Sequence, residues 1–340
     1  MTTKLEKNET KIAIIGLGIQ GTAIAGMFLD LGYKVIGAVD PGEKLGRPLN
    51  DYVRHASAPD TKIFGTISEL ITNVGAPDVS VISASVSAEV VVDLAVELMK
   101  AKSQILTLNG YLFEPSGELF ERLDRVAKEE GVSVLATGIQ DMVYVYLPAV
   151  LMAANHNLSL FKIEDFADTA EFSFDSGLQD AGMALDATEF EKWRKEQLAG
   201  SPIQGAPLRE VARRMGLTPG KMNFDIQPIF AKERLEWPGA SMVLEPGMVI
   251  GSTAVMSFDT EEGVRFEGLL TFKIAEGNET SGHVYVAEGA HTIRVAITEI
   301  DQHVTTDTAV VRRVPDVLAA APGFIRLAML EPGRYIHPAV

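Results

Sequence analysis

The sequence predicts an α/β fold, in which a doubly wound parallel sheet is joined to an α+β domain with a mainly antiparallel sheet. Residues 11–137 alternate short apolar runs with longer amphipathic segments, which is typical of parallel strands connected by helices. A glycine-rich bend separates the first apolar run from the first amphipathic segment. Beyond residue 220, several runs alternate apolar and polar residues, which favours antiparallel strands.

The first 141 residues are expected to form one domain. Its strands are predicted at residues 11–16, 34–40, 78–85, 103–109 and 132–138. Its helices are predicted at residues 20–31, 68–73, 88–100 and 117–130. The third of these helices places Val91, Leu94 and Leu98 on one stripe that can pack on a sheet.

Residues 142–305 are expected to form the second domain, for substrate binding and dimerisation. A connecting helix opens it, and further helices are predicted near residues 187–197 and within 201–216. Strands are predicted at residues 160–168, 224–237, 248–259, 264–277, 283–289 and 291–300. Residues 306–340 are expected to form a C-terminal helix and tail that return to the first domain.

Composition excludes several classes of function. The formal net charge of -16, without a segregated basic patch, excludes nucleic acid as a partner. No apolar stretch approaches the roughly 20 residues of a membrane span, and the polar N-terminus lacks the apolar core of a secretory signal. The absence of cysteine excludes disulfides and thiolate metal sites, so we expect a cytoplasmic protein without a metal centre.

The glycine-rich bend is a complete G-x-G-x-x-G motif, which predicts a Rossmann dinucleotide-binding domain. Gly16 permits the tight turn, Gly18 lets a pyrophosphate approach the backbone, and Gly21 lets the helix pack closely on the strand. The helix start at Ile19 and Gln20 presents backbone N–H groups that favour phosphates. These five residues are predicted to bind a nicotinamide dinucleotide.

Asp40 ends the second predicted strand, about 20 residues after the glycines. A carboxylate at this place accepts hydrogen bonds from ribose hydroxyls, so NAD(H) is favoured. Lys44 and Arg47 are close enough in sequence to compensate for the charge of a 2′-phosphate if they turn inward. We expect both side chains to be solvated loop charges instead. NADP(H) therefore remains an alternative.

Small residues follow the third predicted strand, at the sheet edge where ligands of α/β folds bind. Ser83, Ala84 and Ser85 are predicted to let the cofactor lie close to the backbone. Ser85 or Ser87 can also cap the next helix, and both roles can hold at once. Asn109, at the end of the fourth strand, is predicted to contact the same cofactor.

The glycine motif, residues 107–143 and residues 307–324 together resemble the dihydrodipicolinate-reductase-like family. The most similar branch contains the 2,4-diaminopentanoate dehydrogenases and native amine dehydrogenases. The resemblance implies a Rossmann domain, an α+β substrate domain, a cleft between them and a homodimer. It also implies conversion of amines to ketones plus ammonia by hydride transfer to a nicotinamide.

Two departures separate this chain from that branch. The branch ends its fourth strand with a glutamate pair that supplies the acid/base, whereas Asn109 and Gly110 stand there in this chain. The branch also reads Gly-x-Asn-Pro-Gly where this chain has residues 138–142. Gln140 keeps an amide at this place, but the Pro-Gly turn is absent.

Reduction of C=O or C=N needs a group that donates a hydrogen bond to the heteroatom. The loops after the fourth and fifth strands offer Asn109, Tyr111, Glu114, Gln140 and Tyr144. Tyr111 or Tyr144 can donate to a developing alkoxide, with core packing as the alternative role. Glu114 is the nearest carboxylate that could replace the missing pair, with helix capping as its alternative.

Other polar residues are expected to be structural. Asp141 is expected to be an exposed turn residue, and His283 is expected to lie in a hairpin without binding a metal. An acidic run is expected to form a solvated face, although it could attract a cationic amine: Glu164, Asp165, Asp168 and Glu171.

The sequence therefore predicts an NAD(P)-dependent oxidoreductase that acts on a ketone/alcohol or imine/amine pair in an interdomain cleft. Aromatic residues of the second domain, among them Phe166 and Trp193, suggest a fairly apolar small-molecule substrate, and core packing explains them equally well. Two alternatives stay open. One is an amine dehydrogenase with a substituted acid/base, and the other is a non-catalytic dinucleotide-binding paralogue.

Overall fold

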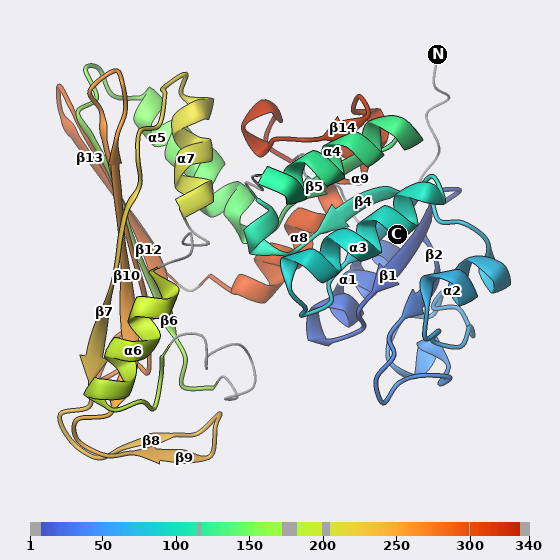
Figure 1. Cartoon of the computed structure of the whole chain (residues 1–340), viewed down its shortest axis with the longest axis horizontal. Helices are drawn as coiled ribbons and strands as arrows, with labels where there is room; N and C mark the ends of the chain where they lie inside the picture. Colours follow the sequence, from blue (N-terminus) through green and yellow to red (C-terminus); the bar gives the residue numbers. More distant parts are fainter. Residues whose placement is uncertain (1–7, 114–116, 172–181, 199–204, 299, 334–340) are drawn as a thin grey trace. The chain divides into compact units, whose positions relative to one another are not determined.

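The computed structural model describes residues 8–113, 117–171, 182–198, 205–298 and 300–333 (Figure 1). The chain divides into two compact units. The first unit contains Met1–Met142 and Asp301–Val340, and the second contains Val143–Ile300. Each unit has its own sheet and its own apolar core, so each is described by itself.

The first unit contains a six-stranded sheet in the order β14-β5-β4-β3-β1-β2, and every pair of neighbours is parallel. Its strands are β1 (Lys11–Ile15), β2 (Lys34–Val39), β3 (Val79–Ile82), β4 (Gln104–Thr107), β5 (Ser133–Ala136) and β14 (Gly323–Phe324). The central strands are buried on both faces, which is why they read as continuous apolar runs. The predicted doubly wound parallel sheet is confirmed.

Helices connect these strands, as the amphipathic segments predicted. They are α1 (Ile19–Asp30), α2 (Ile67–Val74), α3 (Ala88–Lys100) and α4 (Gly117–Glu130). Side-chain caps define where two of these helices begin. The Thr66 side chain accepts from the Glu69 backbone N–H at α2, and the Ser87 side chain accepts from the Val90 N–H at α3. Of the expected stripe of α3, Val91 and Leu98 are buried and Leu94 is half-buried.

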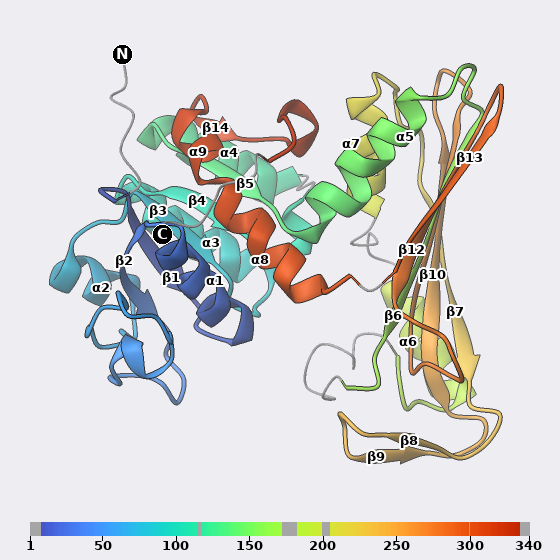
Figure 2. The same cartoon turned by 180° about the vertical axis from the view of Figure 1, so that it is seen from behind.

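The C-terminal segment completes the first unit, in which α8 (Gln302–Arg312) lies beside α1 (Figure 2). Val310 and Val314 join the core that contains Ile24 and Phe28 of α1. The next helix, α9 (Val314–Ala319), is tied to β5 because Ser133 Oγ donates to the Val317 carbonyl over 2.8 Å. Strand β14 then extends the sheet beside β5.

A buried ion pair fixes this returning segment. Asp141 accepts from Arg313 Nε over 2.8 Å and from Thr137 Oγ1 over 2.9 Å. Arg313 also donates to Asp316 and to the Glu331 carbonyl. Only 4% of Asp141 and 1% of Arg313 are exposed, so the expectation of an exposed turn aspartate was wrong. The Asp141 carboxylate therefore anchors the C-terminal segment through Arg313.

The second unit contains a six-stranded sheet in the order β13-β12-β6-β11-β10-β7 and a separate hairpin, β8-β9. Only β6 and β11 are parallel among the pairs of the larger sheet, so the predicted mainly antiparallel sheet is confirmed. The strands are β6 (Leu160–Asp168), β7 (Asn223–Phe230), β8 (Leu235–Trp237), β9 (Met242–Leu244), β10 (Val249–Asp259), β11 (Arg265–Lys273), β12 (Gly282–Glu288) and β13 (Thr292–Thr298).

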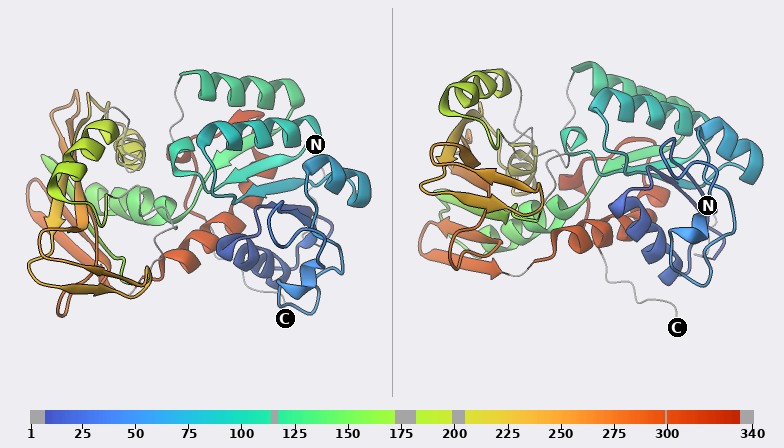
Figure 3. Two further views of the ribbon diagram at one scale, coloured as in Figure 1. Left: turned by 60° about the horizontal axis from the view of Figure 1, so that its bottom comes forward. Right: turned by 90° about the horizontal axis from the view of Figure 1, so that it is seen from below.

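Helices α5 (Leu147–Ala153) and α7 (Gly205–Arg214) lie on the same face of this sheet, whereas α6 (Ala187–Gln197) packs near β7 and β10 (Figure 3). Along strand β6, buried residues alternate with half-buried ones, because the described helices cover one face of the sheet and not the other. Asp165 falls on the buried side with Phe161 and Ile163, so its expected place on a solvated face was wrong. Within the described ranges, no helix is both long and apolar enough to cross a bilayer.

Replacing Arg313 by methionine is expected to destabilise the chain by about 3–5 kcal/mol, because the Asp141 carboxylate would be left buried without its cation. Urea unfolding measures the change. Arg125→Met is the matched control, since Arg125 pairs with Glu129 on the exposed face of α4, and it should cost less than about 1 kcal/mol. Equal losses in both variants would contradict the role given to the buried pair.

Candidate functional site

The bend between β1 and α1 brings three segments of the first unit to backbone contact. Gly16 has a φ of 90°, which disfavours residues with a side chain, and its N–H donates to the Val39 carbonyl over 2.8 Å. A Cβ at Gly16 would lie 2.5 Å from the backbone nitrogen of Ala84. Glycine is therefore required here by both the turn and the loop after β3.

The other two glycines of the motif differ in what the protein requires of them. A Cβ at Gly21 would lie 2.1 Å from the Gly16 carbonyl oxygen, so helix and strand can pack only without a side chain. A Cβ at Gly18 would meet no atom within 4 Å. Packing of the described residues therefore explains Gly16 and Gly21 but not Gly18.

The N-terminus of α1 is electropositive and has no side-chain cap. Gly18 is the N-cap residue and offers no side chain to the free N–H groups, and the first turn contains no acidic residue. Ile19 follows with 84% of its surface exposed. An anion at this helix start would receive backbone N–H groups and the favourable end of the helix dipole.

Asp40 lies where β2 ends, beside the same bend. Its two carboxylate oxygens accept from Leu17 N over 2.8 Å and from Gly42 N over 3.0 Å. Each oxygen keeps a further lone pair for a ligand hydroxyl. The predicted carboxylate is thus oriented by the backbone of the glycine loop.

Lys44 turns inward, contrary to the expectation of a solvated loop charge. Its ammonium donates to the Leu17 carbonyl and lies 5.2 Å from the centre of the Tyr52 ring. Arg47 fits the expectation, since it is exposed and pairs with Asp51 over 3.2 Å. One cation therefore stands beside the glycine loop near Asp40.

The loops after β3 and β4 contribute the remaining predicted cofactor residues. Ser83 Oγ donates to the Gly16 carbonyl over 2.7 Å, which fixes the bend rather than leaving the hydroxyl free. Ser85 is exposed, and Ser87 is the residue that caps α3. Asn109 Nδ2 donates to the Val86 carbonyl over 3.3 Å, so the loops after β3 and β4 are linked.

The structure places only some of the predicted catalytic residues, and it places them in different units. Gln140 Oε1 and Thr306 Cγ2 of α8 both lie where a side chain at Gly138 would begin, 2.8 Å and 3.4 Å from a Cβ built there. Glu114 and the side chain of Tyr111 are outside the described residues. Tyr144 belongs to the second unit and is buried there.

Tyr144 packs in the second unit against a buried carboxylate and imidazole, which we call the Asp165–His283 pair. Asp165 and His283 face each other across β6 and β12, and His283 Nδ1 contacts Asp165 Oδ1 in a close hydrogen bond. The Tyr144 and His283 rings meet edge to face at 6.2 Å, and Tyr285 follows His283 on the same face of β12. Alternation on β6, which puts Asp165 in phase with Phe161, is the signal that could have revealed this pair.

Burial opposes charge on both members of the pair. It raises the pKa of Asp165 to about 8 and lowers the pKa of His283 to about 4. A second buried carboxyl that the sequence did not single out is Asp307 on α8, in the first unit. Burial, helped by nearby Asp301, raises the pKa of Asp307 to about 7.

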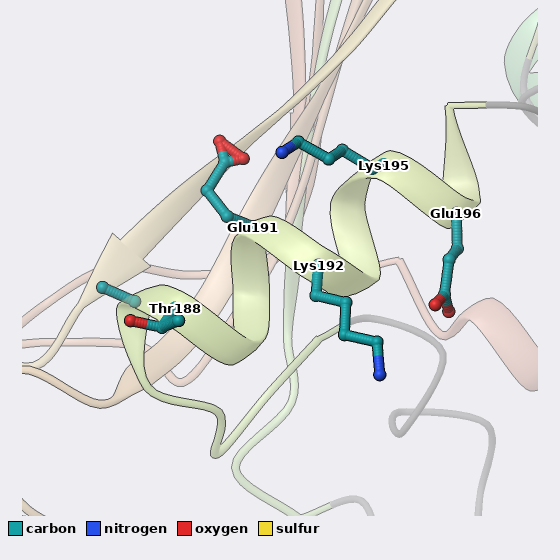
Figure 4. Close-up of a pocket in the computed structure, with 6 residues that line it drawn as sticks. Thr188, Glu191, Lys192, Lys195 and Glu196 are labelled. Atoms are coloured by element: carbon teal, nitrogen blue, oxygen red, sulfur yellow. The ribbon is translucent and has the colours of Figure 1, made fainter.

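A hollow along α6 offers little chemistry by comparison (Figure 4). The residues that line it come from this one helix: Ala187, Thr188, Glu191, Lys192, Lys195 and Glu196. They include charges of both signs, as on a solvated helix face, and Glu191 pairs with Arg194. Across the described part of the chain, no group of three His, Cys, Asp or Glu residues could hold a metal ion.

Comparison with known proteins supports the nucleotide-binding reading of the first unit. A family model described as a CoA binding domain matches residues 7–107. A 2,4-diaminopentanoate dehydrogenase of Acetoanaerobium sticklandii is 31% identical over 152 residues. That stretch covers 42% of this chain and 42% of the relative, so the chain aligns with less than half of the relative's length.

Solved structures resemble the chain over most of its length. An amine dehydrogenase from Mycobacterium smegmatis has a TM-score of 0.87 at 24% identity and covers 96% of this chain and 97% of its own. A scyllo-inositol dehydrogenase from Lactobacillus casei, solved with NAD(H) and scyllo-inositol, has a TM-score of 0.52 at 13% identity. The match covers 84% of this chain and 76% of the other. The predicted fold and the predicted resemblance to 2,4-diaminopentanoate and amine dehydrogenases are confirmed.

Gly18→Ala and Gly21→Ala are expected to separate binding from folding. The first variant should keep its free energy of unfolding within about 0.5 kcal/mol, because no atom of the described residues lies within 4 Å of the added methyl group. The second should lose about 3 kcal/mol or more, because its methyl group overlaps the Gly16 carbonyl. Urea unfolding and NADH titration are the measurements, and Gly18→Ala should bind NADH at least about tenfold more weakly. Unchanged NADH affinity in Gly18→Ala would contradict a pyrophosphate at this bend.

The Asp165–His283 pair predicts a specific dependence of stability on pH. Between about pH 4 and 6.5 the folded pair and the unfolded chain each bind one proton, on aspartate and on histidine respectively, so the pair adds no slope. Between about pH 6.5 and 8 only the folded pair binds a proton, so stability falls by about 1.4 kcal/mol per pH unit.

Asp165→Asn should remove this fall, since asparagine has no proton to lose. In that variant stability should decrease instead on acidification from about pH 6.5 to 4, where the unfolded histidine gains a proton that folded His283 does not. Urea unfolding at pH 5, 6.5 and 8 measures both slopes. Parallel pH profiles for parent and variant would show that the pair does not retain a proton.

Proposed function

We propose that this chain is an NAD(P)-dependent oxidoreductase that transfers hydride between a nicotinamide and the C=O or C=N carbon of a small molecule. The observation that carries the proposal is the β1–α1 bend, where Gly18 is free of packing constraints beside an uncapped helix start. A pyrophosphate against this bend accounts for a glycine at position 18. The bound nicotinamide would supply the hydride.

Residues of the first unit would hold the cofactor. Gly16, Gly18 and the start of α1 would receive the pyrophosphate, and Asp40 would accept from the ribose hydroxyls. The exposed apolar side chain of Ile19 would offer a surface for the cofactor. Ser83 and Ala84 would act by keeping the β3 loop against Gly16 rather than by direct polar contact.

Asp40 favours a dinucleotide over coenzyme A, the ligand named by the matching family model. Coenzyme A carries a phosphate on its ribose, and the Asp40 carboxylate would repel it. The same repulsion acts on the 2′-phosphate of NADP(H). Lys44 lies near enough to the loop to offset part of it, so NAD(H) is the preferred cofactor and NADP(H) the weaker one.

The substrate is proposed to be an amine or the corresponding ketone. An amine dehydrogenase and a 2,4-diaminopentanoate dehydrogenase are both similar to this chain. Reduction adds one hydride and one proton across the double bond, so a proton donor is needed. Asn109 and Gly110 cannot serve as that acid. Burial raises the pKa of Asp165 to about 8 and that of Asp307 to about 7, so both carboxyls are candidates. The homodimer and the cytoplasmic location stay predictions.

Titration of the full chain with NADH, NADPH and coenzyme A tests the proposal. NADH is expected to bind most tightly. Lys44→Ala is expected to weaken NADPH about five- to tenfold more than NADH, because the lost ammonium faces the extra phosphate. Arg47→Ala is the matched control and should change neither affinity, since Arg47 is exposed and pairs with Asp51.

Turnover separates the remaining alternatives. NADH consumption with pentan-2-one should depend on added ammonium if the chain is an amine dehydrogenase, and equal rates without ammonium would favour ketone reduction. Tight NADH binding without turnover of ketones, alcohols or amines would favour the non-catalytic paralogue. Absence of nucleotide binding at millimolar concentration would overturn the proposed function.

A further inference from the structure

Strand β13 forms one edge of the sheet in the second unit, with β12 as its one neighbour among the described strands (Figure 2). It pairs with β12 along its whole length, Thr292–Thr298. Every second residue of β13 is exposed, and the residues between them are half-buried. An edge strand of this kind presents a row of backbone N–H and C=O groups on which another strand can pair.

The opposite edge of the same sheet, β7, is protected against such pairing. Pro228 of β7 has no N–H to offer, and Arg194 of α6 donates to the Ile226 carbonyl over 2.8 Å. Proline and charge are common means of protecting an edge strand. β13 contains no proline and one charged residue, Arg294, whose guanidinium lies 3.9 Å from Glu164 of its own sheet. The chain therefore protects one edge and leaves the other available.

The sequence of β13 matches its own copy. It reads Thr-Ile-Arg-Val-Ala-Ile-Thr and is nearly symmetric about Val295. An antiparallel copy centred on this valine would place threonine beside threonine and isoleucine beside isoleucine at both ends. Arg294 would face Ala296 in both halves, so no like charges would meet. A two-fold axis requires a surface that is complementary to itself, and this strand meets that requirement.

Apolar side chains would meet on one face of that pairing. Ile293, Val295 and Ile297 are half-buried and share the face of the sheet that α7 covers. Helix α5, which contacts β12 on the same face, adds Val150 with 65% of its surface exposed. A second β13 strand would remove the three β-branched side chains of the edge from water and place them against their equivalents.

We infer that β13 pairs with the β13 strand of a second copy of this chain, antiparallel and centred on Val295, so that two sheets join across a two-fold axis. Backbone hydrogen bonds would form between the copies, and the apolar side chains of both edges would be buried. A strand from another protein would need no such symmetry in β13, so the symmetry selects a second copy as the partner. Neither the cofactor nor the substrate of the proposed function takes part in this pairing.

Cross-linking of the full chain tests the register, because the chain has no cysteine of its own. In Val295→Cys the two thiols would meet at the axis, within disulfide reach, so mild oxidation is expected to give a covalent dimer of twice 36.7 kDa. Thr298→Cys is the matched control at a more exposed position of the same strand. Its two thiols would be about 20 Å apart, so it should not cross-link.

Charge at position 296 tests the same register without oxidation. Ala296→Arg should weaken the dimer about five- to tenfold in sedimentation velocity, because each introduced guanidinium would face Arg294 of the other copy. Ala296→Glu should strengthen the dimer by a similar factor, because the introduced carboxylate would attract the same arginine. Gln227→Arg, at an exposed position of the protected edge β7, is the control and should leave the dissociation constant unchanged.

Two results would overturn the inference. One is a parent chain that sediments as a monomer at about 100 µM, since even small stable interfaces hold at that concentration. The other is a dimer that responds to neither charge at position 296, because its two-fold axis would then lie elsewhere on the chain. The second result is decisive even if Val295→Cys does not fold.

Discussion

The first unit depends on the close approach of three backbone segments at the end of β1. The Gly16 carbonyl, the first turn of α1 and the backbone of Ala84 lie so close that a side chain at Gly16 or Gly21 would overlap main-chain atoms. Backbone atoms cannot move aside as a flexible side chain can, so this contact fixes where α1 begins. It thereby also fixes the direction of the N–H groups at the helix start and the place of Asp40 beside Leu17.

Two buried pairs, one in each unit, differ in how fully they are hydrogen-bonded. In the first unit, Asp141 and Arg313 satisfy each other and lock the C-terminal segment onto β5. In the second, the Asp165–His283 pair has a hydrogen bond within it and unused capacity around it. A satisfied ion pair stabilises one arrangement, whereas His283 Nε2 and the Tyr285 hydroxyl stay without a partner among the described residues.

Loss of the glutamate pair of the related dehydrogenases need not remove proton transfer from this chain. Asn109 serves as a link between the β3 and β4 loops, so its position has a structural role. Buried carboxyls elsewhere have the raised pKa that an acid working near neutral pH needs. Alternation along β6 places Asp165 inside the second unit, whereas Asp307 is buried on helix α8 of the first.

The sequence by itself determined the parallel sheet, the order of its helices and the glycine bend, because these follow from local periodicity and from backbone geometry that only glycine allows. It also predicted the place of Asp40, since an acidic residue that ends the second strand about 20 residues after the glycine motif belongs to the same sequence pattern. Only the tertiary structure decided the roles of Asp141, Lys44 and Asp165. Each depends on a partner remote in sequence, Arg313, the Leu17 carbonyl or His283, and burial by distant segments sets the charge that such a group can carry.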